Sequence, residues 1–386
     1  MSGRIVLLGA TGYTGELTAR ALVDSGATPV LAARSAERLD MLARELGGLE
    51  TQVADVTAPE TVRSLVERGD VLISTVGPFA RWGEPAIEAA IATGATYLDT
   101  TGEPAFIRQV FQHHGPAAAR AGTALLTAFG FDFVPGNLAA ELALQLAGPA
   151  TTRLDVGYFS RGSGGIGSGI SGGTKASSAG AVLAPSFAVR GGRLRTERTA
   201  ARVRRFTLDD GTVLQGVSVG GSEHFAVPVR HPQLRDIDVL LQRPGIAGRV
   251  TPALTALLSV AKRIPAVASW LYTVLGSEGS TGGPDAADRS RSPSLIVADA
   301  RSATGELLHR VELEGPNGYD FTARILAWAS VEASRGAITQ TGALGPVAAF
   351  GLEALRAAAD AAGLRLVPQA GGSRPAADGG DEGSTP

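Results

Sequence analysis

The sequence predicts an α/β protein, with a doubly wound parallel sheet followed by a second α+β domain built on an antiparallel sheet. In roughly the first 130 residues, short apolar runs alternate with helical segments of about ten residues, which is typical of strand–helix–strand crossovers. Beyond Leu146 the apolar runs lengthen and pair across turns, as antiparallel strands do. The chain has 386 residues, of which 44% are hydrophobic, and this is enough for two cores.

The first domain is expected to contain six strands, with helices between them. The expected strands are 5–8, 29–33, 51–56, 70–76, 96–100 and 123–128. Helices are expected at 13–23 and 36–46, from a Thr57–Glu60 capping box, through 84–94 and from 102–104 onward. Ligands of such sheets bind beyond the carboxyl ends of the strands, so the segments that follow the strands form the candidate site.

A glycine-rich turn follows the first expected strand, within the sequence IVLLGATGYTGE. Gly9, Gly12 and Gly15 have the spacing G-x-x-G-x-x-G at the joint between a strand and a helix. Such a turn could be only a tight connection. Glycines at this joint also let a pyrophosphate approach the backbone, and the free N–H groups of the helix can bind it. The spacing therefore indicates a Rossmann-type dinucleotide site, of the variety that takes NADP.

The end of the second expected strand supports this interpretation. An NAD site usually places an acid there to hold the ribose 2′-hydroxyl, but residues 29–34 contain none. Arg34 instead offers a planar fork of donors that suits a 2′-phosphate, and Ser35 is a second donor. Ser35 is also expected to cap the next helix, whichever cofactor binds. The sequence thus predicts NADP(H) as the cofactor.

The second domain is expected to begin with a strand at 152–160 and to contain two hairpins. One hairpin covers 204–219 and turns at Asp210–Gly211, and the other covers 294–315. The glycine-rich segment 161–180 is either a lid over the cofactor or a linker. The predicted organisation is an NADP-binding domain at 1–134, a substrate or dimerisation domain at 135–337, a helical segment at 338–368 that returns to the first domain, and a disordered tail at 369–386.

Composition excludes several classes of protein. The chain has no cysteine, which excludes disulfides, thiolate metal sites and cysteine nucleophiles. Its five histidines lack the spacing of metal ligands, so we expect no metal. The net charge of −2 argues against a nucleic-acid partner, and the sequence runs straight into a strand without a signal peptide, as a cytoplasmic enzyme would.

Two further stretches have ordinary structural explanations. The arginines between 190 and 205 are expected to alternate on an exposed strand rather than to bind nucleic acid. The apolar stretch 251–276 is interrupted by Lys262, Arg263 and Pro265, so it is too short for a membrane span. It is expected to be a pair of helices that lines an apolar pocket or the interface of a homodimer.

The proton donor of a nicotinamide enzyme must come from a limited set of residues. The Tyr-x-x-x-Lys pair of short-chain dehydrogenases is absent, because Ser171 and Leu258 stand four residues before the only two lysines. The candidates are His224, which follows Glu223 in an expected strand, Lys175 in the glycine-rich segment, and Asp132 after the sixth strand. A buried histidine, a solvent lysine and a loop carboxylate are the structural alternatives.

Acidic and aromatic residues also occur around the fifth expected strand. Asp99 and Glu103 flank the sequence TTG where that strand ends, at the expected switch of the sheet. Glu103 could serve only to stabilise the N-terminus of a helix, where a carboxylate is favoured. Tyr97 is expected in the core.

Six motifs occur in an order that suggests a family: GATGYTG, AARS, STVGPF, YLDTTGE, GFDFVPGNLA and SGGT. This set resembles the saccharopine dehydrogenase-like oxidoreductases, and in particular the branch of trans-acting enoyl reductases. The family typically has a serine and an aspartate where this chain has Phe133 and Asn137. The resemblance implies an NADPH-binding domain and a reductase-type active site between two domains.

These observations predict an NADPH-dependent reductase that reduces a C=C bond of an apolar, lipid- or polyketide-like substrate. The alternatives are reduction of a C=N bond in a saccharopine-like imine and a non-catalytic regulator that senses NADP. The residues expected to contact the cofactor are Gly9, Thr11, Gly12, Tyr13, Thr14, Gly15, Arg34, Ser35, Asp55, Thr75, Val76, Gly77, Pro78, Phe79 and Thr101.

Overall fold

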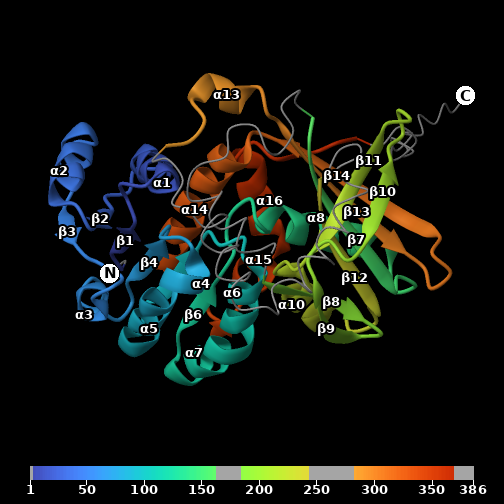
Figure 1. The fold of residues 1–386 in the computed structure, drawn as a ribbon, viewed down its shortest axis with the longest axis horizontal. Helices are drawn as coiled ribbons and strands as arrows, with labels where there is room; N and C mark the ends of the chain where they lie inside the picture. Colours follow the sequence, from blue (N-terminus) through green and yellow to red (C-terminus); the bar gives the residue numbers. More distant parts are fainter. Residues whose placement is uncertain (1–2, 162–183, 243–281, 369–386) are drawn as a thin grey trace, which may run out of the picture.

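Two sheets lie at opposite ends of the molecule, with helices between them (Figure 1). The computed structural model describes residues 3–161, 184–242 and 282–368. The predicted Lys175, most of the glycine-rich segment 161–180, the apolar stretch 251–276 and the C-terminal tail lie outside the described residues.

The first sheet has seven strands, all parallel, in the order β15-β6-β5-β4-β1-β2-β3. Its strands are β1 (Ile5–Leu8), β2 (Val30–Ala33), β3 (Thr51–Val53), β4 (Val71–Ser74), β5 (Thr96–Asp99), β6 (Ala124–Leu126) and β15 (Gly342–Ala343). The central strands are apolar and buried on both faces, as a sheet covered by helices on both sides requires. The prediction of a doubly wound parallel sheet is confirmed, and β15 adds a strand from the far end of the chain.

The helices of the first sheet are α1 (Tyr13–Asp24), α2 (Ala36–Glu45), α3 (Pro59–Arg63), α4 (Phe79–Trp82), α5 (Glu84–Thr93), α6 (Pro104–Gln109), the π-helix η1 (Val110–His114) and α7 (Gly115–Ala121). Ser35 caps α2 by accepting the N–H of Arg38, as expected. The predicted capping box is wrong. Helix α3 begins after Ala58 without a side-chain cap, and the N–H of Thr57 instead binds the carboxylate of Asp55 at 2.8 Å.

The second sheet is mixed. The order β10-β11-β12-β7-β13-β14-β16 forms its main path, and the β8–β9 hairpin joins at β12. The strands are β7 (Arg153–Ser160), β8 (Pro185–Arg190), β9 (Arg193–Arg198), β10 (Val203–Thr207), β11 (Val213–Val219), β12 (Asp236–Gln242), β13 (Ser294–Arg301), β14 (Leu307–Gly315) and β16 (Arg365–Leu366). Both predicted hairpins are present. The expectation of a purely antiparallel sheet is corrected at one pair, because β12 runs parallel to β7.

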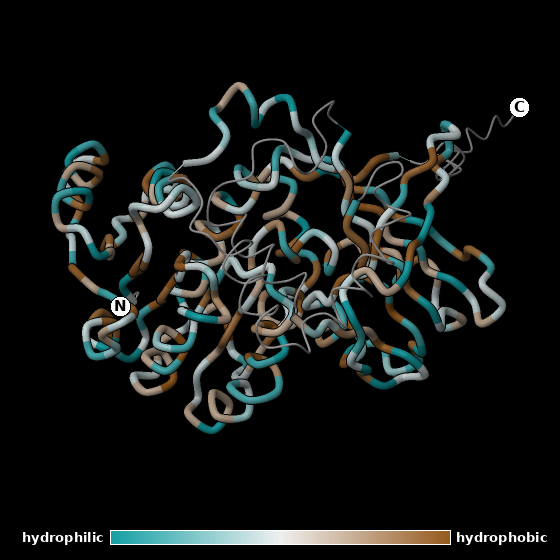
Figure 2. Tube along the Cα trace, viewed as in Figure 1, coloured by the Kyte–Doolittle hydropathy of each residue, from teal (hydrophilic) through white to brown (hydrophobic). Residues whose placement is uncertain are grey.

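One hydrophobic cluster among the described residues spans both sheets. It runs from Leu7 and Leu98 of the first sheet, through Leu138 of α8 (Val134–Ala147), to Val156 and Val311 of the second. Helix α14 (Gly318–Ser334) packs against α1 and against strands of the first sheet. The hydrophobic colour in Figure 2 accordingly gathers along the strands of both sheets.

The C-terminal segment touches both sheets. After β15 come α15 (Pro346–Phe350) and α16 (Leu352–Ala361), separated at Gly351, which has a φ of +80°. Helix α16 contacts α8, and β16 then pairs with β14 of the second sheet. The described residues contain two further helices, α10 (Glu223–Arg230), where the sequence suggested a strand, and α13 (Ala286–Ser290).

Candidate functional site

The glycine loop between β1 and α1 has the geometry of a phosphate site. Gly9 has a φ of +87°, and a Cβ added there would lie 2.7 Å from the Thr75 hydroxyl. A Cβ at Gly15 would lie 2.1 Å from the Gly9 carbonyl oxygen, so α1 can pack this closely only because Gly15 has no side chain. Gly12, the N-cap, provides no side-chain cap, which leaves amides of the first turn open to an anion. The loop thus fits the pyrophosphate of a dinucleotide.

Two arginines lie beside this loop. Arg34 is exposed at the end of β2, and it has no hydrogen bond or ion pair within the described parts of the chain. Arg38, on the first turns of α2, donates to the carbonyl of Thr11 and lies 3.6 Å from the carboxylate of Glu16. The pair offers donors to a 2′-phosphate. The sequence pointed to Arg34 but not to Arg38, which looked like any arginine on the exposed face of a helix.

Tyr13 connects the glycine loop to a segment that follows much later in the chain. Its hydroxyl donates to the carbonyl of Pro284 at 2.5 Å and accepts from the guanidinium of Arg289 at 3.0 Å. Its ring also meets the ring of Tyr319 edge to face, with centroids 5.0 Å apart. The side chain of Tyr13 is therefore held within the protein, so its contribution to a cofactor site would come from its backbone.

The loops after β4 and β5 are tied together by a buried carboxylate. Glu103 accepts the N–H groups of Phe79 at 2.7 Å and Ala80 at 2.9 Å, at the start of α4. Its own N–H donates to the hydroxyl of Thr101, which is fully buried. Glu103 thus stabilises the N-terminus of a helix, as the sequence suggested, but the helix is α4 and not its own. This bond fixes the segment from Thr75 to Phe79 against the next loop.

Two carboxyl groups lie at the carboxyl ends of β5 and β6. Asp99 is buried and accepts the N–H groups of Thr101 and Ala128, both at 2.9 Å, and burial raises its pKa to about 6. Asp132 follows β6, and its Oδ2 would lie 2.7 Å from a Cβ added at Gly102, so it packs against the loop after β5. Desolvation also raises the pKa of Asp132 to about 6. Asp132 is partly exposed and has no hydrogen-bond partner within the described ranges, so its proton is available to a ligand.

The structure gives His224 a different environment from the one expected. His224 is buried on α10, and its ring meets that of Phe187 edge to face at 5.4 Å. Burial lowers its pKa to about 4, which keeps it neutral at pH 7. The neighbouring Glu223 bonds to Tyr158 at 2.7 Å. Glu223 therefore bonds to Tyr158 and not to the His224 ring that follows it in the sequence.

Part of the arginine run is paired with a buried acid, and part of it is exposed. Arg190, Arg202 and Arg204 all bind the carboxylate of Asp238, which is 1% exposed on β12. These arginines more than offset the effect of burial and hold the pKa of Asp238 below its ordinary value. The expectation of exposed arginines is confirmed for Arg193, Arg195 and Arg205. It is wrong for the three arginines that bind Asp238, because the sequence did not show that one buried acid would face them.

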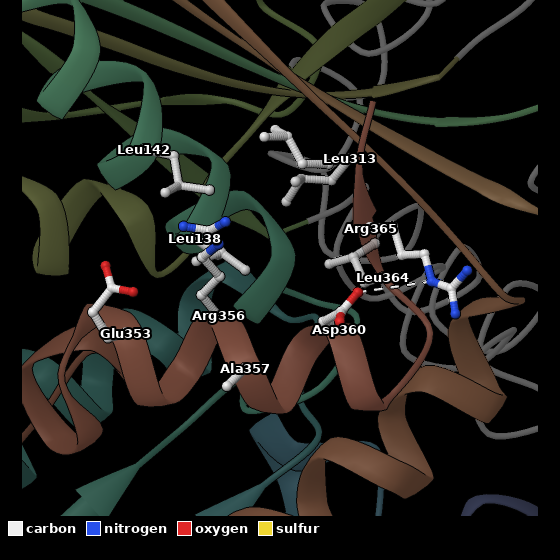
Figure 3. A pocket seen from close by; sticks show the side chains of 10 residues that line it. Leu138, Leu142, Leu313, Glu353, Arg356, Ala357, Asp360, Leu364 and Arg365 are labelled. Carbon is white, nitrogen blue, oxygen red and sulfur yellow. Dashed lines mark ion pairs between the residues drawn. The ribbon is translucent and has the colours of Figure 1, made fainter. Parts of the chain in front are cut away.

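A separate hollow lies between α8, α16 and the strands β14 and β16 (Figure 3). Its lining includes Leu138, Leu142 and Leu313 on one side and Arg356 and Asp360 on the other. None of its lining residues belongs to the glycine loop or to the segment around Asp132. It is therefore distinct from the candidate site.

The described residues contain neither a candidate membrane span nor a candidate metal site. No helix there is long and apolar enough to cross a membrane. No group of three or more potential metal-ligating side chains occurs in the described ranges either. The expectation that no metal takes part in the reaction stays a prediction.

Comparison with known proteins agrees with the geometry of the glycine loop. Residues 5–126 match the family model described as the saccharopine dehydrogenase NADP binding domain. Residues 5–126 thus form an NADP-binding domain of the saccharopine dehydrogenase type, and the cofactor is NADP(H). The resemblance seen in the sequence is confirmed.

The relatives and a solved structure extend this likeness. The chain is 43% identical over 141 residues to a trans-acting enoyl reductase of Mycobacterium leprae, which covers 35% of this chain and 34% of that protein. A trans-acting enoyl reductase of Mycobacterium bovis is 39% identical over 140 residues. The matched segment thus spans about a third of the length of these relatives. The fold is similar to that of apo saccharopine dehydrogenase (L-Glu forming) from Saccharomyces cerevisiae, with a TM-score of 0.57 at 14% identity, over 95% of this chain and 100% of that one.

Proposed function

We propose that the protein is an NADPH-dependent reductase that uses Asp132 as its proton donor. The observation that carries the proposal is the position of Asp132 at the carboxyl edge of the NADP-binding sheet. Its carboxyl group packs against Gly102 and makes no hydrogen bond within the described chain. A carboxyl group with a pKa of about 6 still holds a useful fraction of its proton near neutral pH and releases it readily.

In this scheme NADPH supplies the hydride. The glycine loop would hold the pyrophosphate, and Arg34 with Arg38 would hold the 2′-phosphate. For a conjugated C=C bond, the β-carbon gains the hydride and the α-carbon gains the proton of Asp132. The carboxylate that remains recovers a proton from solvent before the next cycle.

The substrate class rests on two considerations. The mycobacterial relatives are named enoyl reductases, which supports a C=C bond conjugated to a carbonyl. An imine with several carboxylates would call for free arginines in the cleft. Three arginines of the second domain are instead engaged by Asp238. We therefore favour an apolar α,β-unsaturated substrate.

The alternative imine reductase follows from the fold of the yeast saccharopine dehydrogenase. Steady-state kinetics of NADPH oxidation with an α,β-unsaturated thioester or lactone, compared with a polycarboxylate imine, separates the two. A clear preference for the imine would overturn the choice of substrate. Tight NADPH binding without turnover of either substrate would instead favour a non-catalytic regulator that senses NADP.

The role of Asp132 has its own test. Asp132→Asn should lower turnover by about 100-fold or more, the scale of general acid catalysis, while NADPH affinity stays unchanged. In the wild-type protein, kcat/KM should fall as the pH rises through about 6, since the protonated acid is the active form. Unchanged turnover in Asp132→Asn would exclude it as the donor.

A further inference from the structure

The hydroxyl of Tyr158 lies at a junction of three elements beneath the Asp132 loop. It accepts the N–H of Gly136, in the first turn of α8, at 2.9 Å. It also lies 3.3 Å from the carbonyl oxygen of Phe133 and 2.7 Å from Oε1 of Glu223 on α10. Tyr158, Phe133 and Glu223 are all buried. The strand β7, the start of α8 and α10 therefore meet at one oxygen atom.

The number of protons at this junction limits which hydrogen bonds the hydroxyl of Tyr158 can make at the same time. A phenol has one proton, yet two oxygen atoms lie within reach of it. Both contacts are hydrogen bonds only when Glu223 is protonated and donates to Tyr158, which then donates to the carbonyl of Phe133. When Glu223 is ionised, it must accept the phenol proton, and Phe133 loses its bond to β7. The carbonyl then keeps only its bonds from Asn137, which lies on α8.

The surroundings of Glu223 favour its neutral form. Its second oxygen, Oε2, is buried without a hydrogen-bond partner among the described residues, and leaving a charged oxygen in such a place is costly. Burial raises the pKa of Glu223 to about 8, and the charge of Asp132 acts in the same direction. The titratable groups that act on Glu223 here are Tyr158 and Asp132.

The ring of Tyr158 also contacts the two residues on either side of Asp132. The rings of Phe131 and Phe133 both meet the ring of Tyr158 edge to face, with centroids 5.7 and 5.6 Å apart. Tyr158 thus contacts the side chains that precede and follow Asp132, and it binds the carbonyl of the residue that follows. A shift of this tyrosine would move the Asp132 carboxyl relative to the sheet edge.

We propose that Tyr158 and protonated Glu223 are positioning residues, which hold the loop of Asp132 in place by directing the phenol proton to the carbonyl of Phe133. This inference rests on the proposed function of Asp132. Ionisation of Glu223 reverses the Tyr158 bond and releases the loop, so activity depends on a second proton that never reaches the substrate.

The first test is the pH profile of kcat/KM with the enoyl substrate. In the wild-type protein, log kcat/KM should fall with a slope of about −1 above the pKa of Asp132 and steepen towards about −2 above pH 8, where Glu223 ionises. Glu223→Gln should keep the slope at about −1, because its amide donates to Tyr158 and cannot ionise. Tyr158→Phe should lower kcat about 10-fold below pH 8 through misplacement of Asp132, and the difference from the wild type should shrink above pH 8, where the wild type has lost the same bond. A profile of Glu223→Gln that still steepens like the wild type would overturn the proposal.

The second test needs no substrate and so separates this inference from the proposed function. Because the pKa of Glu223 is raised on folding from 4.5 to about 8, its contribution to stability is present below 4.5 and is lost as the pH rises to about 8. The difference in the free energy of unfolding, wild type minus Glu223→Gln, should therefore decrease as the pH rises from 4.5 to about 8. Above pH 8 it should stay constant. The exposed Glu353→Gln is the matched control and should follow the wild type.

The two tests can fail separately. In one outcome, the stability difference has the expected pH dependence while neither the wild type nor any variant reduces an enoyl or imine substrate. In that case the proposed proton arrangement at Tyr158 and Glu223 is supported, and the proposed reductase function is wrong. If turnover is found but the stability difference is independent of pH, Glu223 is not the buried acid described here and the inference is wrong.

Discussion

The bond between Glu103 and the start of α4 allows a quantitative prediction. Glu103 is 4% exposed and accepts two N–H groups, from Phe79 at 2.7 Å and from Ala80 at 2.9 Å. Glu103→Gln keeps one acceptor oxygen but turns an NH₂ group towards the other N–H, so one charge-assisted bond is lost. Such a bond contributes about 1.5–3 kcal/mol, so Glu103→Gln should destabilise by this amount and Glu103→Ala by about 3–6 kcal/mol.

Urea unfolding followed by circular dichroism measures this loss, and Glu60→Gln is the control. Glu60 is also in the first turn of a short helix but is exposed, so its substitution should change the stability by less than about 0.5 kcal/mol. Because Phe79 begins the helix next to the expected cofactor segment, NADPH affinity should fall in Glu103→Gln as well. A Glu103→Gln protein as stable as the Glu60→Gln control would refute the reasoning.

Three further predictions concern the cofactor loop and the buried ion pairs. Arg34→Asp should weaken NADPH binding by about 1–3 kcal/mol and leave NADH binding unchanged, which calorimetric titration would show; equal affinity of the wild type for both cofactors would contradict it. Gly15→Ala should destabilise the apo protein by about 1–3 kcal/mol, because the added Cβ would lie 2.1 Å from the carbonyl oxygen of Gly9. Gly12→Ala should destabilise it less, because its Cβ would lie 3.3 Å from the same oxygen. Thermal unfolding compares the two variants, and equal melting temperatures would contradict the prediction. Asp238→Asn should destabilise by about 3–5 kcal/mol at pH 7, because three arginines lose a charged partner. The loss should shrink as the pH falls below 3.8, because Asp238 of the unfolded chain takes up a proton there while the folded protein still keeps the carboxylate ionised. A constant difference from pH 7 to pH 3 would contradict the last.

The first domain was predictable because most of its strands are short, largely apolar runs separated by turn residues. The glycine loop and Arg34 carry a local signal, since a tight turn and a terminal arginine are visible without tertiary structure. The sequence did not reveal helix α8, because this helix lacks a clear local pattern. Its residues are buried on nearly every side between the two sheets, so the sequence VPGNLAAELALQLA lacks the polar face that marks a surface helix.

The site residues of the second domain depend on contacts that are distant in the sequence. Tyr158 and Glu223 are 65 residues apart, and nothing in either local sequence pairs them. Pro228 within α10 concealed the helix that carries Glu223 and His224. The sequence could therefore nominate His224 and Asp132 as candidates, but only the structure distinguishes a neutral, enclosed imidazole from a partly exposed carboxyl at the sheet edge.

The central claim is that this fold transfers a hydride from NADPH to a C=C bond while Asp132 donates the proton. The most direct measurement uses NADPH deuterated at the transferable position with an α,β-unsaturated thioester, and it locates the label in the product by mass spectrometry and NMR. We expect one deuterium at the β-carbon, a solvent-derived proton at the α-carbon, and loss of product formation in Asp132→Asn. NADPH that binds tightly yet passes no deuterium to any unsaturated substrate would contradict it.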